Sequence, residues 1–355
     1  ESSVVANDYW DLASLAEAHM VLGDEAAARR ELQAAATSDP DWSMRATTNR
    51  QLSLVAAANG LNPASVDELE NPSVVQYTGH MFTAGPEADL RRSLVRALEE
   101  RNVGAVYGSL ACGSDIVVAE SALVVGAEVH IFLPCPEQAF LDQSVAIGGP
   151  SWLPRWHRVK DNATSFNPEP TQALADDAMF AYCDQLAMGT ALLRARRLGT
   201  EVFQLALWDG DGGQAVAGTG SAVRRWRELG GETTVIELAR NDLEPVSASP
   251  GVGVESGRPR HVRAMLFADV RGFSALAEPK LPEFFEDVMG GLAEVIDGFG
   301  EAVRYRNTWG DALYIVFSDP LAAANCALDI QARLQTLAEE LGWPGLSARI
   351  GGHAG

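Results

Sequence analysis

The chain has little cysteine and little basic charge, and both shortages exclude classes of protein. Its 355 residues include four cysteines, none in a C-x-x-C pair, so the spacings of a zinc site and of a redox motif are absent. Scattered cysteines with apolar neighbours are most simply reduced core residues of a cytosolic protein. Lys and Arg number 27 against 48 Asp and Glu, a formal net charge of −21. Such a surface repels phosphate backbones and anionic lipid, so we expect neither nucleic-acid nor membrane partners.

A long uninterrupted apolar segment is also missing. The nearest approach, residues 116–133, contains charged residues and is broken by Gly126, so a helix followed by a buried strand explains it better than a membrane span. No signal peptide opens the chain, which begins at Glu1 without a methionine. We therefore expect a cytoplasmic protein, of which this sequence is a fragment.

Residues 1–70 are predicted to be helical and are rich in alanine. The run YWDLASLAEAHMVLGDEAAARRELQAAATSDP has the spacing of a tetratricopeptide repeat, with a turn at Gly23-Asp24, and a third helix is predicted over 42–58. Because one repeat cannot bury its own apolar face, it should stack on further repeats upstream or on the next domain. An ordinary helical hairpin without a ligand is an equally open interpretation. The signature positions are Leu12, Leu15, Ala16, His19, Ala28, Leu32, Ala35 and Pro40.

Residues 71–240 alternate between strand-like and helix-like stretches. The buried-strand candidates are SVVQYTG, GAVYGSL, AEVHIFLP, EVFQLALWD and TTVIEL. Helical stretches such as 87–100 and 115–125 separate them, which predicts an open, mostly parallel α/β sheet. Ligands of such sheets bind beyond the carboxyl ends of the strands.

One loop in this segment is a candidate phosphate site. In YGSLACGSDIVVAESALVVGAEVHIFLP a strand leads through a glycine-containing loop into a helix, and the N–H groups at a helix N-terminus suit a phosphate. The loop resembles that of the SLOG superfamily, which has a Rossmann-like fold and many nucleotide-sensing members. The resemblance implies a regulatory phosphate site, whereas in the alternative interpretation the glycines only close a tight βα turn. The residues concerned are Gly79, His80, Gly108, Ser109, Gly113 and Ser114.

The last segment carries two acidic residues of interest. Turn-forming residues fill 241–259 and predict a linker, after which 260–355 follow the order β-α-β-β-α-β of a ferredoxin-like fold. Asp269 ends the first predicted strand, and Asp311 lies on the turn of the hairpin YRNTWGDALYIVF. Two such carboxylates can meet in space and provide the hard oxygen ligands that Mg²⁺ or Mn²⁺ prefers. Taken singly, they would be a helix cap and a turn residue.

Three motifs of this segment, FADVRGF, WGDALYIVF and RIGGHAG, resemble the class III nucleotide cyclases in sequence and in order. The resemblance implies a cyclase that converts ATP or another nucleoside triphosphate to a 3′,5′-cyclic nucleotide. It implies two metal ions, Mg²⁺ or Mn²⁺, bound by Asp269 and Asp311, and a homodimer in which each domain supplies part of both sites. The N–H groups that would hold the triphosphate are those of Val270, Arg271, Gly272, Phe273 and Ser274.

The sequence departs from the family at two places. Asn307 stands where the family's base-recognising lysine would, four positions before Asp311, and strand alternation points Arg306 to the opposite face. We therefore expect a relaxed or altered base preference, with cyclic AMP the product that the family favours. The family's transition-state Asn and Arg would lie beyond Gly355, so we expect this chain to have no catalytic residue of that kind and no turnover alone.

The order of segments also resembles bacterial cyclases that carry a "TRAFs-binding" tetratricopeptide region. This implies that the N-terminal segments regulate the cyclase and that the repeat has a protein partner. The alternative is a ligand- or protein-binding signalling module whose cyclase-like segment is not catalytic.

Overall fold

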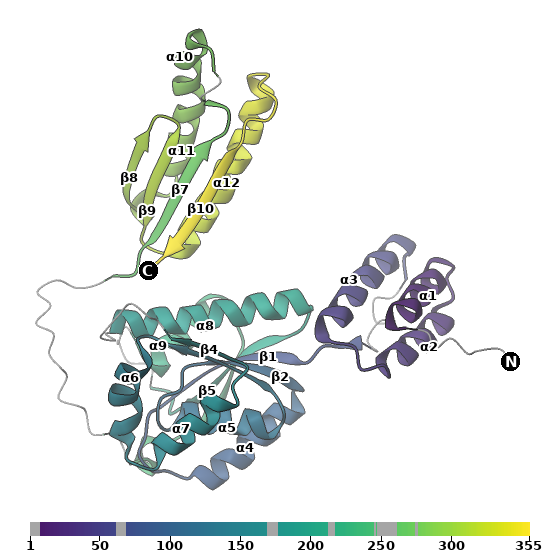
Figure 1. Ribbon diagram of the computed structural model, residues 1–355, viewed down its shortest axis with the longest axis vertical. Coiled ribbons are helices and arrows are strands. Elements are labelled where there is room, and N and C mark those ends of the chain that lie inside the picture. Colours follow the sequence, from purple (N-terminus) through teal and green to yellow (C-terminus); the bar gives the residue numbers. More distant parts are fainter. Residues whose placement is uncertain are drawn as a thin grey trace, which may run out of the picture. The chain divides into compact units, whose positions relative to one another are not determined.

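The structure is a computed structural model of the chain, which divides into two compact units (Figure 1). It describes residues 8–61, 69–168, 177–211, 217–244, 246, 261–273 and 276–355. Unit 1 is Glu1–Val254 and unit 2 is Glu255–Gly355. No helix in the described part of the chain is long and apolar enough to cross a membrane.

Unit 1 begins with three helices. They are α1 (Tyr9–Val21), α2 (Glu25–Ala36) and α3 (Trp42–Asn59). An aspartate precedes each of them and accepts a hydrogen bond from an N–H of the first turn, which stabilises the helix start. Ala16 and Ala28 are fully buried, as small residues at the contact of a helix pair must be. Trp42 of α3 packs against α8 (Asp177–Leu198), so the three helices are stacked on the domain that follows them.

The rest of unit 1 is a parallel sheet of six strands, in the order β4-β3-β2-β1-β5-β6. The strands are β1 (Ser73–Gly79), β2 (Val103–Gly108), β3 (Glu128–Leu133), β4 (Ser165–Pro168), β5 (Val202–Trp208) and β6 (Thr233–Glu237). The remaining helical segments are α4 (Glu87–Glu100), α5 (Ser114–Val124), α6 (Glu137–Phe140), η2 (Leu141–Val145), η3 (Ala146–Gly148), α7 (Trp152–Asp161), α9 (Thr219–Glu228) and η4 (Arg240–Asp242). The predicted parallel α/β sheet is therefore present, with β4 as an additional edge strand.

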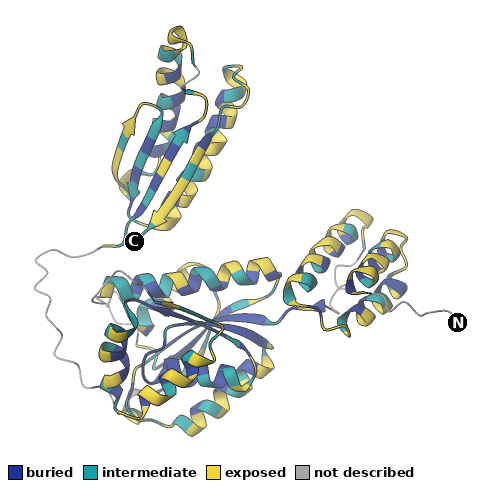
Figure 2. Cartoon of the chain, in the orientation of Figure 1, coloured by how far each residue is buried: buried dark blue, intermediate teal, exposed yellow. Residues whose placement is uncertain are grey.

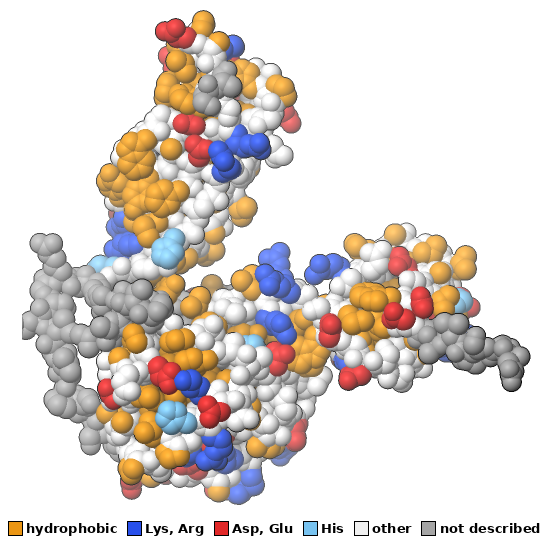
Figure 3. All heavy atoms as spheres, in the orientation of Figure 1, with side chains coloured by type: hydrophobic (Ala, Val, Ile, Leu, Met, Phe, Trp, Pro, Cys, Tyr) orange, Lys and Arg blue, Asp and Glu red, His pale blue; other side chains and the backbone are white. Residues whose placement is uncertain are grey.

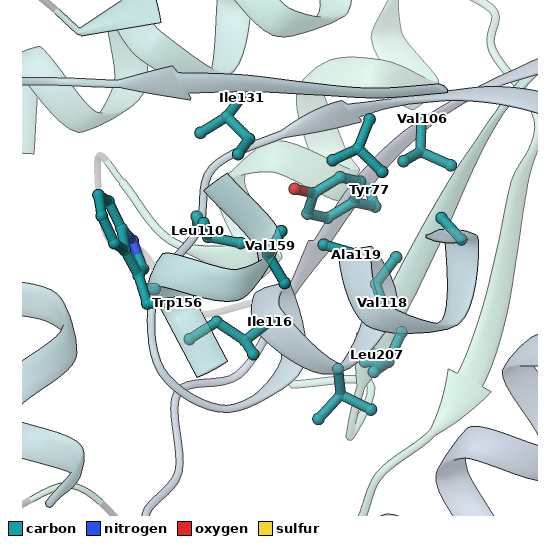
Figure 4. Packing of buried hydrophobic residues seen from close by; sticks show 14 of the residues in the cluster. Tyr77, Val106, Leu110, Ile116, Val118, Ala119, Ile131, Trp156, Val159 and Leu207 are labelled. Atoms are coloured by element: carbon teal, nitrogen blue, oxygen red, sulfur yellow. The ribbon is translucent and has the colours of Figure 1, made fainter. Parts of the chain in front are cut away.

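Both faces of this sheet are covered, which explains why its strands are continuous apolar runs. On one face α5 and α7 pack on β1, β2, β3 and β5, with Ile116, Trp156 and Val159 among the buried side chains (Figure 4). On the other face α8 covers Ala105 and Tyr107 of β2. The four cysteines are all buried and unpaired, as the sequence predicts.

The start of the predicted linker is folded onto unit 1. Thr83 donates its N–H to the C=O of Glu244, and Glu244 donates its N–H to the C=O of Ala84, both at 2.9 Å. Leu243 packs against the core beside them. Residues 245 and 247–259 of the predicted linker lie outside the described residues.

Unit 2 is a four-stranded antiparallel sheet in the order β10-β7-β9-β8. The strands are β7 (Ala264–Val270), β8 (Val303–Trp309), β9 (Ala312–Phe317) and β10 (Ala348–Ala354). The helical segments are η6 (Glu278–Lys280), α10 (Leu281–Glu283), η7 (Phe284–Met289), α11 (Gly290–Asp297), η8 (Gly300–Ala302) and α12 (Pro320–Glu340). The predicted β-α-β-β-α-β order is observed, but the first helix contains a π-helical segment, η7, ahead of α11.

Burial alternates along the strands of unit 2 (Figure 2). Leu266, Ala268 and Val270 are buried against the helices, whereas Phe267 between them is 52% exposed. This period of two means that the helices cover one face of the sheet and leave the other open. The two are called below the helical face and the open face.

Candidate functional site

Asp269 at the end of β7 and Asp311 in the β8–β9 turn lie next to each other. Ala312, which follows Asp311, is the register partner of Asp269, and Val270 donates its N–H to the C=O of Asp311 at 3.3 Å. The described residues contain no group of three or more His, Cys, Asp or Glu side chains that could hold a metal ion. Two carboxylates fit a divalent ion that takes its other ligands from phosphate or water, the usual arrangement for Mg²⁺.

Arg349 of β10 faces Asp269 across the strand pair. Its Nη2 lies 3.0 Å from Oδ2 of Asp269, and the two residues are register partners. The side chains are 78% and 45% exposed, so water screens this ion pair, and an incoming metal or anion can replace it. Arg349 lies in the motif RIGGHAG, but the pairing of β10 with β7 is not visible in the sequence, so its place beside Asp269 could not be predicted.

A cavity of about 460 Å³ on the open face contains both members of this ion pair. Its volume is that of a small-molecule site. The side chains around Asp269 and Arg349 are mainly apolar, so a charged ligand would meet its charged contacts at one end. The other lining residues are Phe267, Ala268, Trp309, Ala312, Leu313, Ile350 and Gly351.

Exposed aromatic rings surround Tyr314 on the open face. The ring of Tyr314 is stacked on Phe267 at 4.6 Å and on Trp309 at 6.2 Å between centroids, and it contacts Tyr305 at 5.9 Å. Phe267, Tyr305 and Trp309 are each more than half exposed. Figure 3 shows hydrophobic side chains gathered over β8 and β9. A contiguous exposed patch of this kind marks an interaction surface, called below the aromatic face.

The predicted triphosphate-binding N–H groups are only partly available. Val270 donates its N–H to the C=O of Asp311 and Arg271 donates its N–H to the C=O of Ser347 at 2.8 Å, so these two N–H groups already have protein acceptors. Gly272, with φ +91° and an exposed backbone, and Phe273 have no backbone acceptor among the described residues. Ser274 lies outside the described residues.

Asn307 is in the edge strand β8, in register with Tyr314. Its Oδ1 accepts a hydrogen bond from the N–H of Thr308 at 2.9 Å, which leaves the side-chain NH₂ as the freer donor. Its neighbours point as strand alternation predicts. Tyr305 meets Tyr314 on the open face, and Arg306 pairs with Asp297 on the helical face.

In unit 1 the six predicted phosphate-site residues lie at the carboxyl ends of β1 and β2, packed closely together. Ser114 donates its N–H to the C=O of His80 at 3.1 Å. Oδ2 of Asp115 accepts the N–H of Ala111, and Ser144 accepts that of Cys112. These three N–H groups therefore point to protein acceptors.

The glycines of this loop are tightly surrounded. A Cβ on Gly79 would lie 2.4 Å from that of Ser114, one on Gly108 would lie 2.6 Å from the Tyr77 ring, and one on Gly113 would lie 2.5 Å from the N of Phe82. The contacts favour the alternative interpretation, a tight βα turn. The hydroxyls of Ser109 and Ser114 are nevertheless buried without a hydrogen-bond partner among the described residues, and Nε2 of His80 lies 3.0 Å from Oδ1 of Asp209.

Comparison with known proteins finds likeness among solved structures. No known family model matches the chain, and no curated protein does. A bacterial light-regulated adenylyl cyclase is 22% identical over 27% of this chain and 55% of its own, with a TM-score of 0.24. A Trypanosoma brucei adenylate cyclase is 20% identical over 28% and 58%, with a TM-score of 0.23.

DNA processing protein A from Streptococcus pneumoniae is 14% identical over 48% of this chain and 60% of its own, with a TM-score of 0.24. The chain thus spans less than two-thirds of the length of each of these proteins. At such identities and TM-scores the likeness carries no functional argument.

Proposed function

We propose that unit 2 is the first part of a nucleotide cyclase domain, with a ferredoxin-like fold, which converts a nucleoside triphosphate to a 3′,5′-cyclic nucleotide and pyrophosphate. The observation that carries the proposal is the juxtaposition of Asp269, Asp311 and Arg349. Two carboxylates that can hold a divalent ion, beside a guanidinium that can hold phosphate oxygens, are the groups that triphosphate chemistry requires.

The chain's own residues bind and orient the substrate. Asp269 and Asp311 would hold Mg²⁺ or Mn²⁺, which supplies a lowered pKa at the ribose 3′-hydroxyl and neutralises charge on the leaving pyrophosphate. Arg349 would exchange its contact with Asp269 for phosphate oxygens, which it can bind through two N–H groups at once. The N–H groups of Gly272 and Phe273 are left to hold the same phosphates.

The aromatic face supports a homodimer as the active form. Rings that are half exposed lose that exposure when a second copy covers them, and the burial of apolar area stabilises the pair. The cavity with Asp269 and Arg349 lies on the same open face, so each copy would close the site of the other. Unit 1, a Rossmann-like parallel domain carrying a tetratricopeptide-like helical region, would then be the regulatory part and would bind the protein or nucleotide-type partner.

The test is to identify the product of the complete protein. It is incubated with Mn²⁺ and an equal mixture of ATP, GTP, CTP and UTP, and the nucleotides and pyrophosphate are quantified. We expect cyclic nucleotide and pyrophosphate in equal amounts, with cyclic AMP in excess. With Asn307 in place of a lysine, we expect less than about a hundredfold preference for ATP, a difference of roughly 2.7 kcal/mol.

The Asn307→Lys variant serves as the matched comparison and should sharpen the preference for ATP. Formation of nucleoside diphosphate and orthophosphate would contradict the proposal. An absence of any turnover would leave the alternative, a binding module whose cyclase-like segment is not catalytic.

A further inference from the structure

A second cavity of unit 2 lies on the helical face of the sheet. Its volume is about 390 Å³, within the range of small-molecule sites. The helix contributes Phe285, Met289 and Ala293, and the sheet contributes Leu313 and Ile315. The walls on both sides are thus apolar, and the ring of Phe285 is 47% exposed.

One charged side chain lines this cavity. Arg306 of the edge strand β8 pairs through Nη1 with Asp297 at the end of α11. No other partner of its guanidinium is present among the described residues, so its remaining N–H groups can donate to a ligand. The side chain is 49% exposed, and Asn307 and Thr308 of the same strand are the other polar residues that line the cavity.

The helical wall has an unusual form. Phe285 and Met289 belong to η7, a π-helical segment of six residues that runs into α11. Such segments are rare and widen the helix locally, and they occur often at functional sites. The widened part of the helix therefore lies at the cavity, and two of the six side chains of η7 form the helical wall of the cavity.

We propose that this cavity, the helix–β8 pocket, binds a small molecule with an apolar ring-bearing body and one acidic group. The body lies between η7 and the side chains of Leu313 and Ile315, and the acidic group pairs with Arg306. The rim also includes Asn307 and Gly310, which lead directly into Asp311. Occupancy would therefore fix the position of the β8–β9 turn and regulate turnover, a consequence that rests on the proposed function.

Binding is tested on the 355-residue chain, without reference to activity. The probes are 1-anilinonaphthalene-8-sulfonate, an aromatic anion, and N-phenyl-1-naphthylamine, its neutral counterpart. Both are titrated by fluorescence. Ala293→Phe, which fills the pocket, should weaken both probes at least tenfold, whereas Ala324→Phe on the exposed side of α12 should change neither. Arg306→Gln should weaken the anion at least fivefold and leave the neutral probe unchanged.

The Phe285→Ala variant covers the case in which Ala293→Phe unfolds unit 2. Phe285 is half exposed, so its loss should weaken both probes without lowering the melting temperature. Probe affinities that no pocket variant changes, or an absence of bound probe, would overturn the site. An equal effect of Arg306→Gln on both probes would overturn its preference for an acidic ligand.

Discussion

Asp115, the second residue of α5, is a carboxyl group in a place that water hardly reaches. It is 9% exposed, and its Oδ2 accepts the N–H of Ala111 at 3.1 Å. Burial raises the pKa of Asp115 to about 7, and the hydrogen bond from Ala111 offsets part of that rise. The carboxyl of Asp184 in α8 also has a pKa raised to about 7, by burial and then by the nearby Asp115.

A pH dependence of stability follows from Asp115. Its folded-state pKa lies above the unfolded value near 3.9, so the folded chain binds a proton that the unfolded chain releases. The contribution of Asp115 to the free energy of unfolding is therefore present at pH 4 and is lost as the pH rises to about 7. The loss is about 1.4 kcal/mol per pH unit and roughly 4 kcal/mol at most.

Asp115→Asn keeps an acceptor for Ala111 and removes the titration. Urea unfolding at several pH values should show the free energy of unfolding of the variant rising relative to that of the wild type from pH 4 to pH 7. Parallel curves for the wild type and Asp115→Asn would contradict the burial of a titrating carboxyl.

At the scale of single residues, the sequence predicted the site residues that lie in local motifs. It missed the contacts that depend on which strands pair. Asp269 and Asp311 could be singled out because each has a motif around it. Arg349 and the use of the Val270 and Arg271 N–H groups depend on which strand lies beside which, and a single sequence does not contain that order. The hydrogen bond of the Asn307 side chain to its own neighbour was invisible for the same reason.

Among the elements, the turn between β2 and α5 leaves little room for a side chain at Gly113. Gly113 has φ +90° and ψ −127°, a region essentially restricted to glycine, and a Cβ there would lie 2.5 Å from the N of Phe82. Gly126, which follows α5, has φ +77° and nothing within 4 Å of its Cβ position. The two glycines thus share a positive φ and differ in the space around them.

Alanine at the two positions separates strain from steric overlap. Gly126→Ala should lower the free energy of unfolding by about 1 kcal/mol, because only φ is strained. Gly113→Ala should lower it by at least ~3 kcal/mol, since a backbone atom must also move. Chemical denaturation measures both without any ligand. Equal losses of unfolding free energy in the two variants would mean that the turn at Gly113 is open, as a phosphate site requires. That result would favour the phosphate interpretation over the tight βα turn.

The elements themselves were predicted best where periodicity was strong. β1 and α4 begin and end where their sequence patterns do, because each pattern is unbroken and follows a proline. β4, an edge strand of four residues, is too short to show a period. The π-helical η7 was predicted as ordinary helix, because packing rather than propensity decides between the two.

Across the whole molecule, the two sheets are covered differently. Unit 1 buries both faces of its sheet between helices, and Trp42 of α3 packs on the face that α8 covers. The apolar surface of this sheet is therefore covered within the unit. Unit 2 leaves the aromatic face open beside Asp269 and Arg349. In the proposed homodimer, this open face of unit 2 is the surface that the second copy would cover.

The most direct measurement of the central claim is turnover after removal of either carboxylate. In the complete protein, Asp269→Asn and Asp311→Asn should each reduce Mn²⁺-dependent cyclic-nucleotide formation by more than tenfold, over ~1.4 kcal/mol of barrier. Both variants should keep the melting temperature of the wild type, since each side chain is partly exposed. Asp329→Asn, on the exposed side of α12, should keep the full rate. A rate above about a tenth of wild type in either carboxylate variant would contradict the assignment of Asp269 and Asp311 as the metal-binding pair.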